Sequence, residues 1–284
     1  MKLRKTILAI AAIACVSITG AVSAEDRPTS ITIATEGAYP PWNYTEADGT
    51  LVGYEIELID EICGRLKVEC EVVAQDWNGI IPGLTAGKYD AIIASMGATD
   101  ERRKVVDFSD PYARAPNGFL VSSSGSLADL PFAGQTFNLG GDTSELEGAL
   151  AELKPFVQGK TLGVQGGSTA ANFANEVLKG IVEIKEYGTV DQHNLDLTAG
   201  RIDLVVGNVT SLAAAAEDIG DTVKIAGPSF TGGVLGAGTT HVAVRKSEPA
   251  LLEMMNEAVA SIIADGTNSK LTKKWFGVDI GNPN

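Results

Sequence analysis

A stretch that occurs twice constrains the fold of this chain more than any other feature of its sequence. LTAGKYDAIIAS at 84–95 returns as LTAGRIDLVVGN at 197–208. Each copy runs from a helix-like end through a glycine, a basic residue and an aspartate into an apolar run. Gly87 and Gly200 suit the position just after a helix, and the apolar runs suit buried parallel strands. LTAG alone would be weak evidence, but this longer shared order predicts two lobes built on one plan.

Strand-like and helix-like segments alternate along the rest of the chain, which is typical of an α/β protein. Segments 30–35 and 160–165 have the composition of strands, whereas 55–66 places its apolar residues on one face of a helix. We therefore predict that each lobe is a parallel-dominated sheet flanked by helices.

A ligand site is expected between the two lobes. Ligands of open parallel sheets lie beyond the carboxyl ends of the strands. The repeat makes Ser95 and Asn208 equivalent strand ends. We therefore expect residues 94–102 and 207–210 to face each other across a cleft.

Residues 1–24 carry the features of a secretory signal peptide. Lys2, Arg4 and Lys5 precede an apolar stretch, and a small-residue cleavage site ends at Ala24. The apolar stretch is too short to span a bilayer. We expect cleavage after Ala24 and export to the periplasm rather than a permanent membrane anchor.

The mature chain, Glu25 to Asn284, is strongly acidic. Loss of residues 1–24 removes three of the 22 basic residues and none of the 36 acidic ones, so the formal charge changes from −14 to −17. Such a charge argues against nucleic acid or an anionic membrane as a partner. The remaining 260 residues are enough for two domains of ordinary size.

Two cysteines remain in the mature chain, Cys63 and Cys70. In an oxidising compartment they suggest one local disulfide, which should contribute roughly 2 to 3 kcal/mol through loop entropy. Metal binding is the alternative, but two thiols with only His193 and His241 make a poor zinc set. Both histidines are expected to be structural, and no metal or cofactor is predicted.

Two segments carry candidate residues for binding an anion. Arg102 follows the predicted strand end at 94–97, and a guanidinium can hold a carboxylate through two parallel hydrogen bonds; spacing alone leaves a surface position equally open. Ser168 and Thr169 begin a predicted helix after two glycines, which also suits an anion, with an ordinary N-cap as the alternative. The lysine of a phosphate-binding loop is missing, so a carboxylate fits better than a nucleotide.

A third segment, TEGAYPPWNY at 35–44, places an acidic residue beside aromatic ones. Glu36 with the aromatic faces of Tyr39 and, after the next strand, Trp77 would suit a cationic group. Trp42 remains a candidate for the core.

Together these stretches resemble the periplasmic solute-binding proteins of family 3, which capture polar amino acids for ABC importers, in particular the lysine/arginine/ornithine, histidine and opine branch. The resemblance covers the mature chain and includes DGTLVGYEIELIDEIC, GIIPGLTAGKYDAIIASMGATDERR, DFSDPY, LGVQGGST, LDLTAGRID and ADGTNSKLTKKWFG. It implies a type II two-lobe fold that closes on its ligand by a hinge motion. Lobe 1 would comprise 25–118 and 226–284 and lobe 2 would comprise 119–225, with crossing segments near 113–119 and 222–227.

The resemblance also implies roles for individual residues. Arg102 would hold the ligand α-carboxylate with help from Ser168 and Thr169. Tyr39 and Trp77 would flank the ligand side chain, whose distal cationic group would face Glu36. The full set expected at the ligand is Glu36, Tyr39, Trp77, Ala94, Ser95, Met96, Gly97, Arg102, Asn117, Gln165, Ser168, Thr169 and Asn208.

Two positions depart from the pattern of the amino-acid binders. Where those proteins usually carry a hydroxyl and then an aspartate for the ligand α-ammonium, this chain has Gly97 and Asn208. A neutral asparagine is a poorer partner for a primary ammonium, and Gly97 leaves more room. Both changes suit an N-substituted amino acid whose α-nitrogen carries a second carboxyl-bearing arm, which is an opine. Compared with plain amino-acid binders, lobe 2 carries an insertion at 132–159, of unassigned role. The segment 190–203 looks closest to the octopine-binding type.

The expected function is ligand capture for an ABC importer, with an arginine-derived opine such as octopine or nopaline as ligand and the permease subunits as partners. A binding protein for basic amino acids is the alternative. A dehydratase-like enzyme on the same fold is less favoured, because it would need a general acid or base in the cleft. Delivery of the ligand to a chemoreceptor would use the same binding chemistry. We expect a monomer without enzymatic activity.

Overall fold

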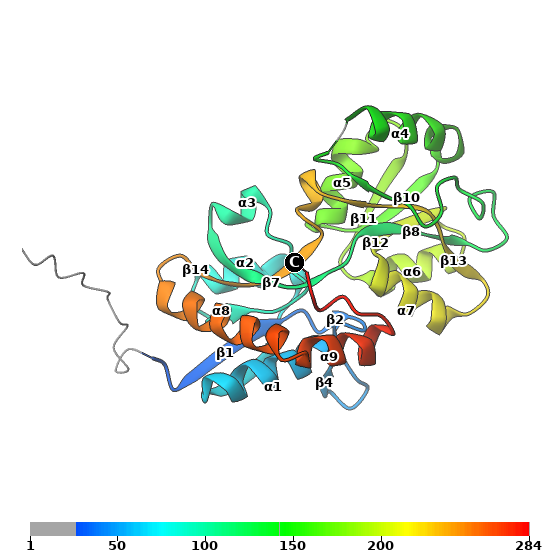
Figure 1. Ribbon diagram of the computed structural model, residues 1–284. Helices are drawn as coiled ribbons and strands as arrows, with labels where there is room; N and C mark the ends of the chain where they lie inside the picture. Colours follow the sequence, from blue (N-terminus) through cyan, green and yellow to red (C-terminus); the bar gives the residue numbers. More distant parts are fainter. Residues whose placement is uncertain (1–26, 142, 284) are drawn as a thin grey trace, which may run out of the picture.

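The computed structural model describes residues 27–141 and 143–283, so the predicted signal peptide and its cleavage site lie outside the described residues. Two large sheets divide the chain into two parts (Figure 1). We call the part around the five-stranded sheet lobe 1 and the part around the six-stranded sheet lobe 2. The predicted α/β fold with two lobes is confirmed.

Lobe 1 is built on a sheet with the order β5-β1-β6-β14-β7, in which β1 is parallel to β5 and β6 while β14 is antiparallel to β6 and β7. Its strands are β1 (Ser30–Thr35), β5 (Glu69–Ala74), β6 (Ala91–Ile92), β7 (Val106–Arg114) and β14 (Thr239–Arg245). Its helices are α1 (Tyr54–Leu66), α2 (Trp77–Thr85), α3 (Asp100–Arg103), α8 (Pro249–Ala264) and α9 (Thr267–Phe276). A small antiparallel sheet of β2 (Ala38–Tyr39), β3 (Asn43–Thr45) and β4 (Leu51–Val52) precedes α1.

The central strands of lobe 1 are apolar on both faces because helices cover both faces of the sheet. Ala91 and Ile93 pack with residues of α1 and α8, whereas Ile92 and Ala94 pack with residues of α2. This alternation explains why the sequence there reads as a continuous apolar run rather than as alternating apolar and polar residues.

Lobe 2 repeats this plan with the order β11-β10-β12-β8-β13-β9. Its strands are β8 (Asn117–Ser122), β9 (Thr136–Asn138), β10 (Thr161–Gln165), β11 (Glu183–Tyr187), β12 (Leu204–Asn208) and β13 (Val223–Thr231). Its helices are α4 (Thr143–Val157), α5 (Thr169–Val177), α6 (Val190–Thr198) and α7 (Val209–Ile219), with a short 3-10 helix, η2 (Gly233–Leu235), beside them. The predicted insertion at 132–159 supplies β9 and α4, and β9 extends this sheet at one edge.

The repeated sequence has the same structural role in both lobes. Asp90 accepts a hydrogen bond from the backbone N–H of Thr32 in the neighbouring strand (2.9 Å), and Asp203 accepts one from Thr161 in the same way (2.8 Å). The glycines that follow α2 and α6 both adopt left-handed backbone, which ends each helix without strain. The two lobes therefore share local contacts as well as strand order.

The chain passes between the lobes twice. The first passage lies between β7 and β8, inside the predicted segment 113–119. The second prediction, 222–227, is corrected by the pairing of β13, which stays in the lobe 2 sheet against β8 and β9 as far as Thr231. The chain enters the lobe 1 sheet only at Thr239, so the second passage is 232–238 and residues 226–231 belong with lobe 2.

Cys63 on α1 and Cys70 on β5 form a disulfide, as predicted. Within 27–141 and 143–283, no helix has the length and apolar character needed to cross a membrane. The same residues contain no group of three or more side chains suited to hold a metal ion.

Candidate ligand-binding site

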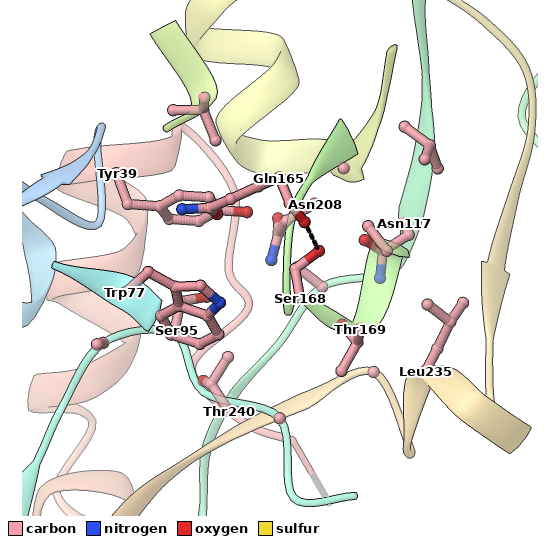
Figure 2. Close-up of a pocket in the computed structure, with 18 of the residues that line it drawn as sticks. Tyr39, Trp77, Ser95, Asn117, Gln165, Ser168, Thr169, Asn208, Leu235 and Thr240 are labelled. Carbon is pink, nitrogen blue, oxygen red and sulfur yellow. Dashed lines mark hydrogen bonds between the residues drawn. The ribbon is translucent and has the colours of Figure 1, made fainter. Parts of the chain in front are cut away.

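A cavity lies between the two lobes, at the carboxyl ends of the parallel strands. The empty space in it, counted out to its mouth and including open solvent there, is about 650 Å³. Figure 2 shows side chains from both lobes directed into it. It is lined by Glu36, Tyr39, Trp77, Ala94, Ser95, Gly97, Arg102, Ala115, Asn117, Gln165, Ser168, Thr169, Ala170, Val190, His193, Val206, Gly207, Asn208, Leu235, Gly238, Thr239 and Thr240.

The cavity brings together every residue that the sequence predicts at the ligand except Met96. The Met96 side chain is fully buried in the core of lobe 1, among residues of α2 and the sheet. Its neighbours Ser95 and Gly97 line the cavity, so Met96 points to the opposite side of this segment. The binding roles of the lining residues remain predictions.

Arg102 enters the cavity from α3, where Thr99 caps the helix and accepts a hydrogen bond from the Arg102 backbone N–H. Its guanidinium donates to the carbonyls of Gly97 (2.9 Å) and Gly167 (3.0 Å) and lies 5.1 Å from the ring centre of Trp77. Burial lowers the pKa of Arg102 to about 10, so it is still charged at neutral pH. No carboxylate pairs with it among the described residues. A partly buried cation without an acidic partner favours an anionic ligand.

The start of α5 faces Arg102 from lobe 2. Ser168 is the N-cap of this helix: its hydroxyl accepts from the backbone N–H of Ala171 (3.0 Å) and donates to the carbonyl of Gln165 (2.7 Å; Figure 2). The Ser168 side chain therefore acts as an ordinary N-cap, which was the alternative to direct anion binding. The next two backbone N–H groups, those of Thr169 and Ala170, lie at the cavity wall and have no acceptor within the described parts of the chain. These N–H groups are the ones that a helix start offers to an anion.

Glu36 supplies a negative charge at another part of the cavity. Its carboxylate is buried and accepts a hydrogen bond from the side-chain amide of Gln165 in lobe 2 (2.6 Å). Burial raises the pKa of Glu36 to about 7, against the opposing effect of the Gln165 bond, and the nearby acids Glu55, Asp76 and Asp191 add to the rise. A cationic group would restore the ionised form of Glu36. Tyr39 and Trp77 present their rings beside this region (Figure 2).

Asn208 is the N-cap of α7, and this role fixes the orientation of its amide. The side-chain oxygen accepts from the backbone N–H of Thr210 (3.0 Å) and from the Thr210 hydroxyl (2.7 Å). The amide nitrogen therefore remains for the cavity, and it points into the space between Trp77 and Ser168 (Figure 2). Asn117 pairs with Asn208 across neighbouring strands, which places the two amides side by side on one face of the sheet.

Gly97 lies where the two lobes approach each other. A Cβ atom at this position would be 3.3 Å from the Thr169 methyl group of lobe 2 and 3.9 Å from the carbonyl oxygen of Leu235. The absence of a side chain therefore allows close contact between the lobes. Ser95, two residues earlier, has left-handed backbone with φ 47°, which is unusual for a residue other than glycine.

Direct hydrogen bonds hold the lobes together around the cavity. Besides those of Arg102 and Gln165, the indole N–H of Trp42 donates to the Thr210 hydroxyl (2.9 Å), and the Ser211 hydroxyl donates to the carbonyl of Pro40 (2.9 Å). The Trp42 ring itself is fully buried in the core of lobe 1, as expected. The structure is thus that of the two lobes in contact.

Several lining residues were not predicted from the sequence. His193 on α6 is buried at the cavity wall, and burial lowers its pKa to about 4, so it is neutral. His241 is structural as expected, because its two ring nitrogens contact Thr239 and the carbonyl of Ser109. Leu235 and Gly238 line the cavity because the second passage between the lobes runs through 232–238.

Comparison with known proteins places these features in context. Residues 31–278 match the model of the bacterial extracellular solute-binding proteins, family 3. The octopine-binding periplasmic protein of Rhizobium meliloti is 39% identical over 283 residues, which cover 93% of this chain and 95% of that protein. The L-arginine-binding protein of Pseudomonas aeruginosa is 33% identical over 264 residues and 92% of each chain. An ancestral arginine-binding protein bound to arginine superposes with a TM-score of 0.73 at 33% identity, covering 88% of this chain and 99% of that one.

Proposed function

This chain belongs to the bacterial extracellular solute-binding proteins of family 3, and from that membership we propose that it captures an arginine-derived opine of the octopine or nopaline type. An opine of this kind carries a guanidinium side chain and two carboxylate-bearing arms joined through one nitrogen, and the second arm of nopaline bears an additional carboxylate. The observation that carries the proposal is the amide of Asn208, which offers the cavity a hydrogen-bond donor and no acceptor.

One carboxylate of the ligand would lie between Arg102 and the start of α5. The guanidinium of Arg102 has no acidic partner among the described residues, and the N–H groups of Thr169 and Ala170 face the same space. Charge-assisted hydrogen bonds from both sides would hold a carboxylate firmly. Because one donor group belongs to each lobe, this carboxylate would also favour contact between the lobes.

The second carboxylate distinguishes an opine from a free amino acid. A primary ammonium needs acceptors, but the oxygen of Asn208 is already used by Thr210. The amide nitrogen of Asn208 is a donor, which suits a carboxylate and not an ammonium, and the amide nitrogen of the adjacent Asn117 could donate to the same carboxylate. Gly97 lines the same cavity, and its missing side chain lets the Thr169 methyl group of lobe 2 approach this part of the wall.

The guanidinium of the ligand would face Glu36, with Tyr39 and Trp77 beside it. Ion pairing and cation-π contact both favour this arrangement. Relatives named for octopine and for arginine are both consistent with a guanidinium at this end.

We place the protein in the periplasm, as the names of its relatives suggest, and we propose that a monomer delivers its ligand to the permease of an ABC importer. We propose no enzymatic activity. The roles of the individual lining residues are part of the same proposal.

Calorimetric titration of protein freed of retained ligand by unfolding and refolding tests the proposal. We expect octopine or nopaline to bind more tightly than arginine. Arginine binding at least as tightly as both opines would overturn the opine assignment and leave a basic amino-acid binder. Native mass spectrometry of protein purified without unfolding identifies the retained ligand independently.

One observation favours a second candidate function. A carboxyl whose pKa is raised to about 7 in a cavity, as for Glu36, is also typical of a general acid or base. Incubation of the protein with its bound ligand, followed by mass spectrometry, decides between the two. An unchanged ligand mass supports binding alone, and a changed mass would support the dehydratase-like alternative.

A further inference from the structure

A second buried carboxylate lies behind the cavity wall and does not reach the cavity. Glu55, in the first turn of α1, is fully buried, and it forms no salt bridge among the described residues. It is not among the residues that line the cavity. A buried carboxylate without a cation is costly unless hydrogen-bond donors surround it. Its donors therefore indicate what it does.

Three donors converge on Glu55 from three different segments. Its Oε1 accepts from the backbone N–H of Ser95 (2.6 Å) and from the hydroxyl of Tyr112, while its Oε2 accepts from the side-chain amide of Asn43 (2.6 Å). Asn43 also links Glu55 to Gly37, because the side-chain oxygen of Asn43 accepts a hydrogen bond from the backbone N–H of Gly37 (2.7 Å).

These segments form the lobe 1 side of the candidate site. Ser95 lines the cavity and precedes the turn to Gly97, and its left-handed φ of 47° needs support from its surroundings. Gly37, with φ 72°, directly follows Glu36. Tyr112 belongs to β7, the strand that leads to the first passage between the lobes. One carboxylate thus connects the segment after β1, the segment after β6 and β7, the strand that precedes the first passage between the lobes.

We propose that Glu55 is a positioning residue that sets the relative placement of Glu36 and Ser95, and hence the shape of the ligand site, without touching the ligand. The placement depends on Glu55 being an acceptor at both oxygens. A glutamine has the same shape, but one of its two terminal atoms is a donor.

The pattern of donors and acceptors makes a specific rescue possible. In Glu55→Gln, the new amide nitrogen faces the amide nitrogen of Asn43; if the Asn43 amide rotates, its nitrogen faces the N–H of Gly37 instead. If the introduced amide turns the other way, its nitrogen faces the N–H of Ser95, so every arrangement brings two donors together. The additional change Asn43→Asp removes this conflict, because its carboxylate accepts both from the introduced glutamine amide and from the N–H of Gly37. The double variant also keeps one carboxylate in the pair.

Amide hydrogen exchange followed by NMR tests the proposal without any ligand. Measurements at about pH 8 keep Glu55 ionised, since burial raises its pKa to about 7 against the hydrogen bonds from Tyr112, Ser95 and Asn43. In Glu55→Gln we expect the Gly37 and Ser95 amides to exchange roughly 10- to 100-fold faster, the factor for a lost charge-assisted bond. Addition of Asn43→Asp should restore slow exchange. Asp60→Asn, an exposed change on the same helix, should have no effect.

Affinity for octopine and arginine is then measured for the same variants. This step rests on the proposed function. For whichever compound the unmodified protein binds, we expect Glu55→Gln to lower the affinity and the double variant to restore it. Unchanged exchange at Gly37 and Ser95 in a folded Glu55→Gln protein would overturn the proposal. Altered exchange with unchanged affinity would also overturn the proposal, because Glu55 would then contribute only to the stability of lobe 1. If the unmodified protein binds neither compound, the proposed function fails, while the exchange data still test the placement.

Discussion

The two lobes share one topology but supply different chemistry to the cavity. Lobe 1 contributes Arg102, which is charged at pH 7, and Glu36, whose pKa of about 7 leaves it partly ionised there, together with aromatic rings. The lining side chains of lobe 2 are neutral at pH 7, since even the pKa of His193 is lowered to about 4 by burial. Lobe 2 instead contributes amides and the backbone N–H groups of a helix start. We infer that lobe 1 attracts the charged ends of a ligand and that lobe 2 completes their hydrogen bonds.

This difference arises from the segment that comes after each equivalent strand end. In lobe 2 the strand β12 continues directly into α7, so its last residue, Asn208, becomes a helix cap with its donor toward the cavity. In lobe 1 a loop follows Ser95, and this loop carries the chain to Arg102 on the short helix α3. The shared plan fixes where the site lies, whereas the segment after each strand fixes which groups it presents.

The largest effect is expected when lobe 1 loses its cation. Arg102→Ala would leave a ligand carboxylate buried and unpaired, which should weaken binding by roughly 3 to 5 kcal/mol. Calorimetry with octopine and arginine measures the loss. Arg103→Ala is the matched control, because Arg103 is the exposed neighbour of Arg102 and should leave affinity unchanged. Full affinity in Arg102→Ala would remove Arg102 from the site.

A negative charge on a lining side chain of lobe 2 would remove the difference in charge between the two lobes. Asn208→Asp keeps the size and the capping oxygen, since aspartate is an equally good N-cap, but replaces the cavity-facing donor by an acceptor. We expect octopine to bind roughly 10- to 100-fold more weakly and arginine to bind more tightly. Gln158→Glu, an exposed change in lobe 2, controls for net charge. Equal effects on both compounds would contradict our assignment of Asn208.

The acid of lobe 1 predicts a pH dependence. The pKa of Glu36 in the empty site is raised to about 7 by burial, so the carboxyl is protonated below that pH and cannot pair with a guanidinium. Affinity for octopine should therefore rise about tenfold between about pH 6 and pH 8 and then level off. Titrations across this range check the rise. Glu36→Gln should bind more weakly and lose most of the rise; a profile that persists unchanged in this variant would assign it to another group, first of all Glu55, whose pKa burial also raises to about 7.

The smallest effect concerns the contact between the lobes. In Gly97→Ser, the new Cβ would lie 3.3 Å from the Thr169 methyl group, so the lobes would need to separate slightly. We expect a loss of about fivefold, together with a shift in preference between octopine and nopaline. Thr169→Ser, which removes the methyl group, should recover part of the loss. An unchanged preference would mean that Gly97 is only a turn residue.

The repeat in the sequence predicted the fold and the location of the cavity, because the same local contacts of Asp90 and Asp203 underlie both copies. The second passage was placed too early: the family resemblance put it near 222–227, but β13 continues beyond an irregularity between Ala226 and Phe230. Consequently Leu235 and Gly238 were missed at the cavity.

Side-chain directions were the least predictable part of the site. The sequence indicated a helix around His193 but not which of its faces meets the cavity. It placed Met96 with its neighbours, although adjacent residues of an extended segment point to opposite sides. For Asn208, the sequence NVT before an alanine-rich helix was a signal for an N-cap. An N-cap at this position would have predicted the exposed donor of its amide.

The hydrogen bond from the Trp42 indole to Thr210 has an optical consequence. Thr210 is also the residue that fixes the amide of Asn208, so the indole of lobe 1 is joined through one hydroxyl to a residue at the ligand site in lobe 2. Separation of the lobes would break this bond and expose the indole N–H to water. If the lobes open and close around a ligand, the fluorescence emission of Trp42 should change with this motion, and Trp42 would then report closure without an attached label.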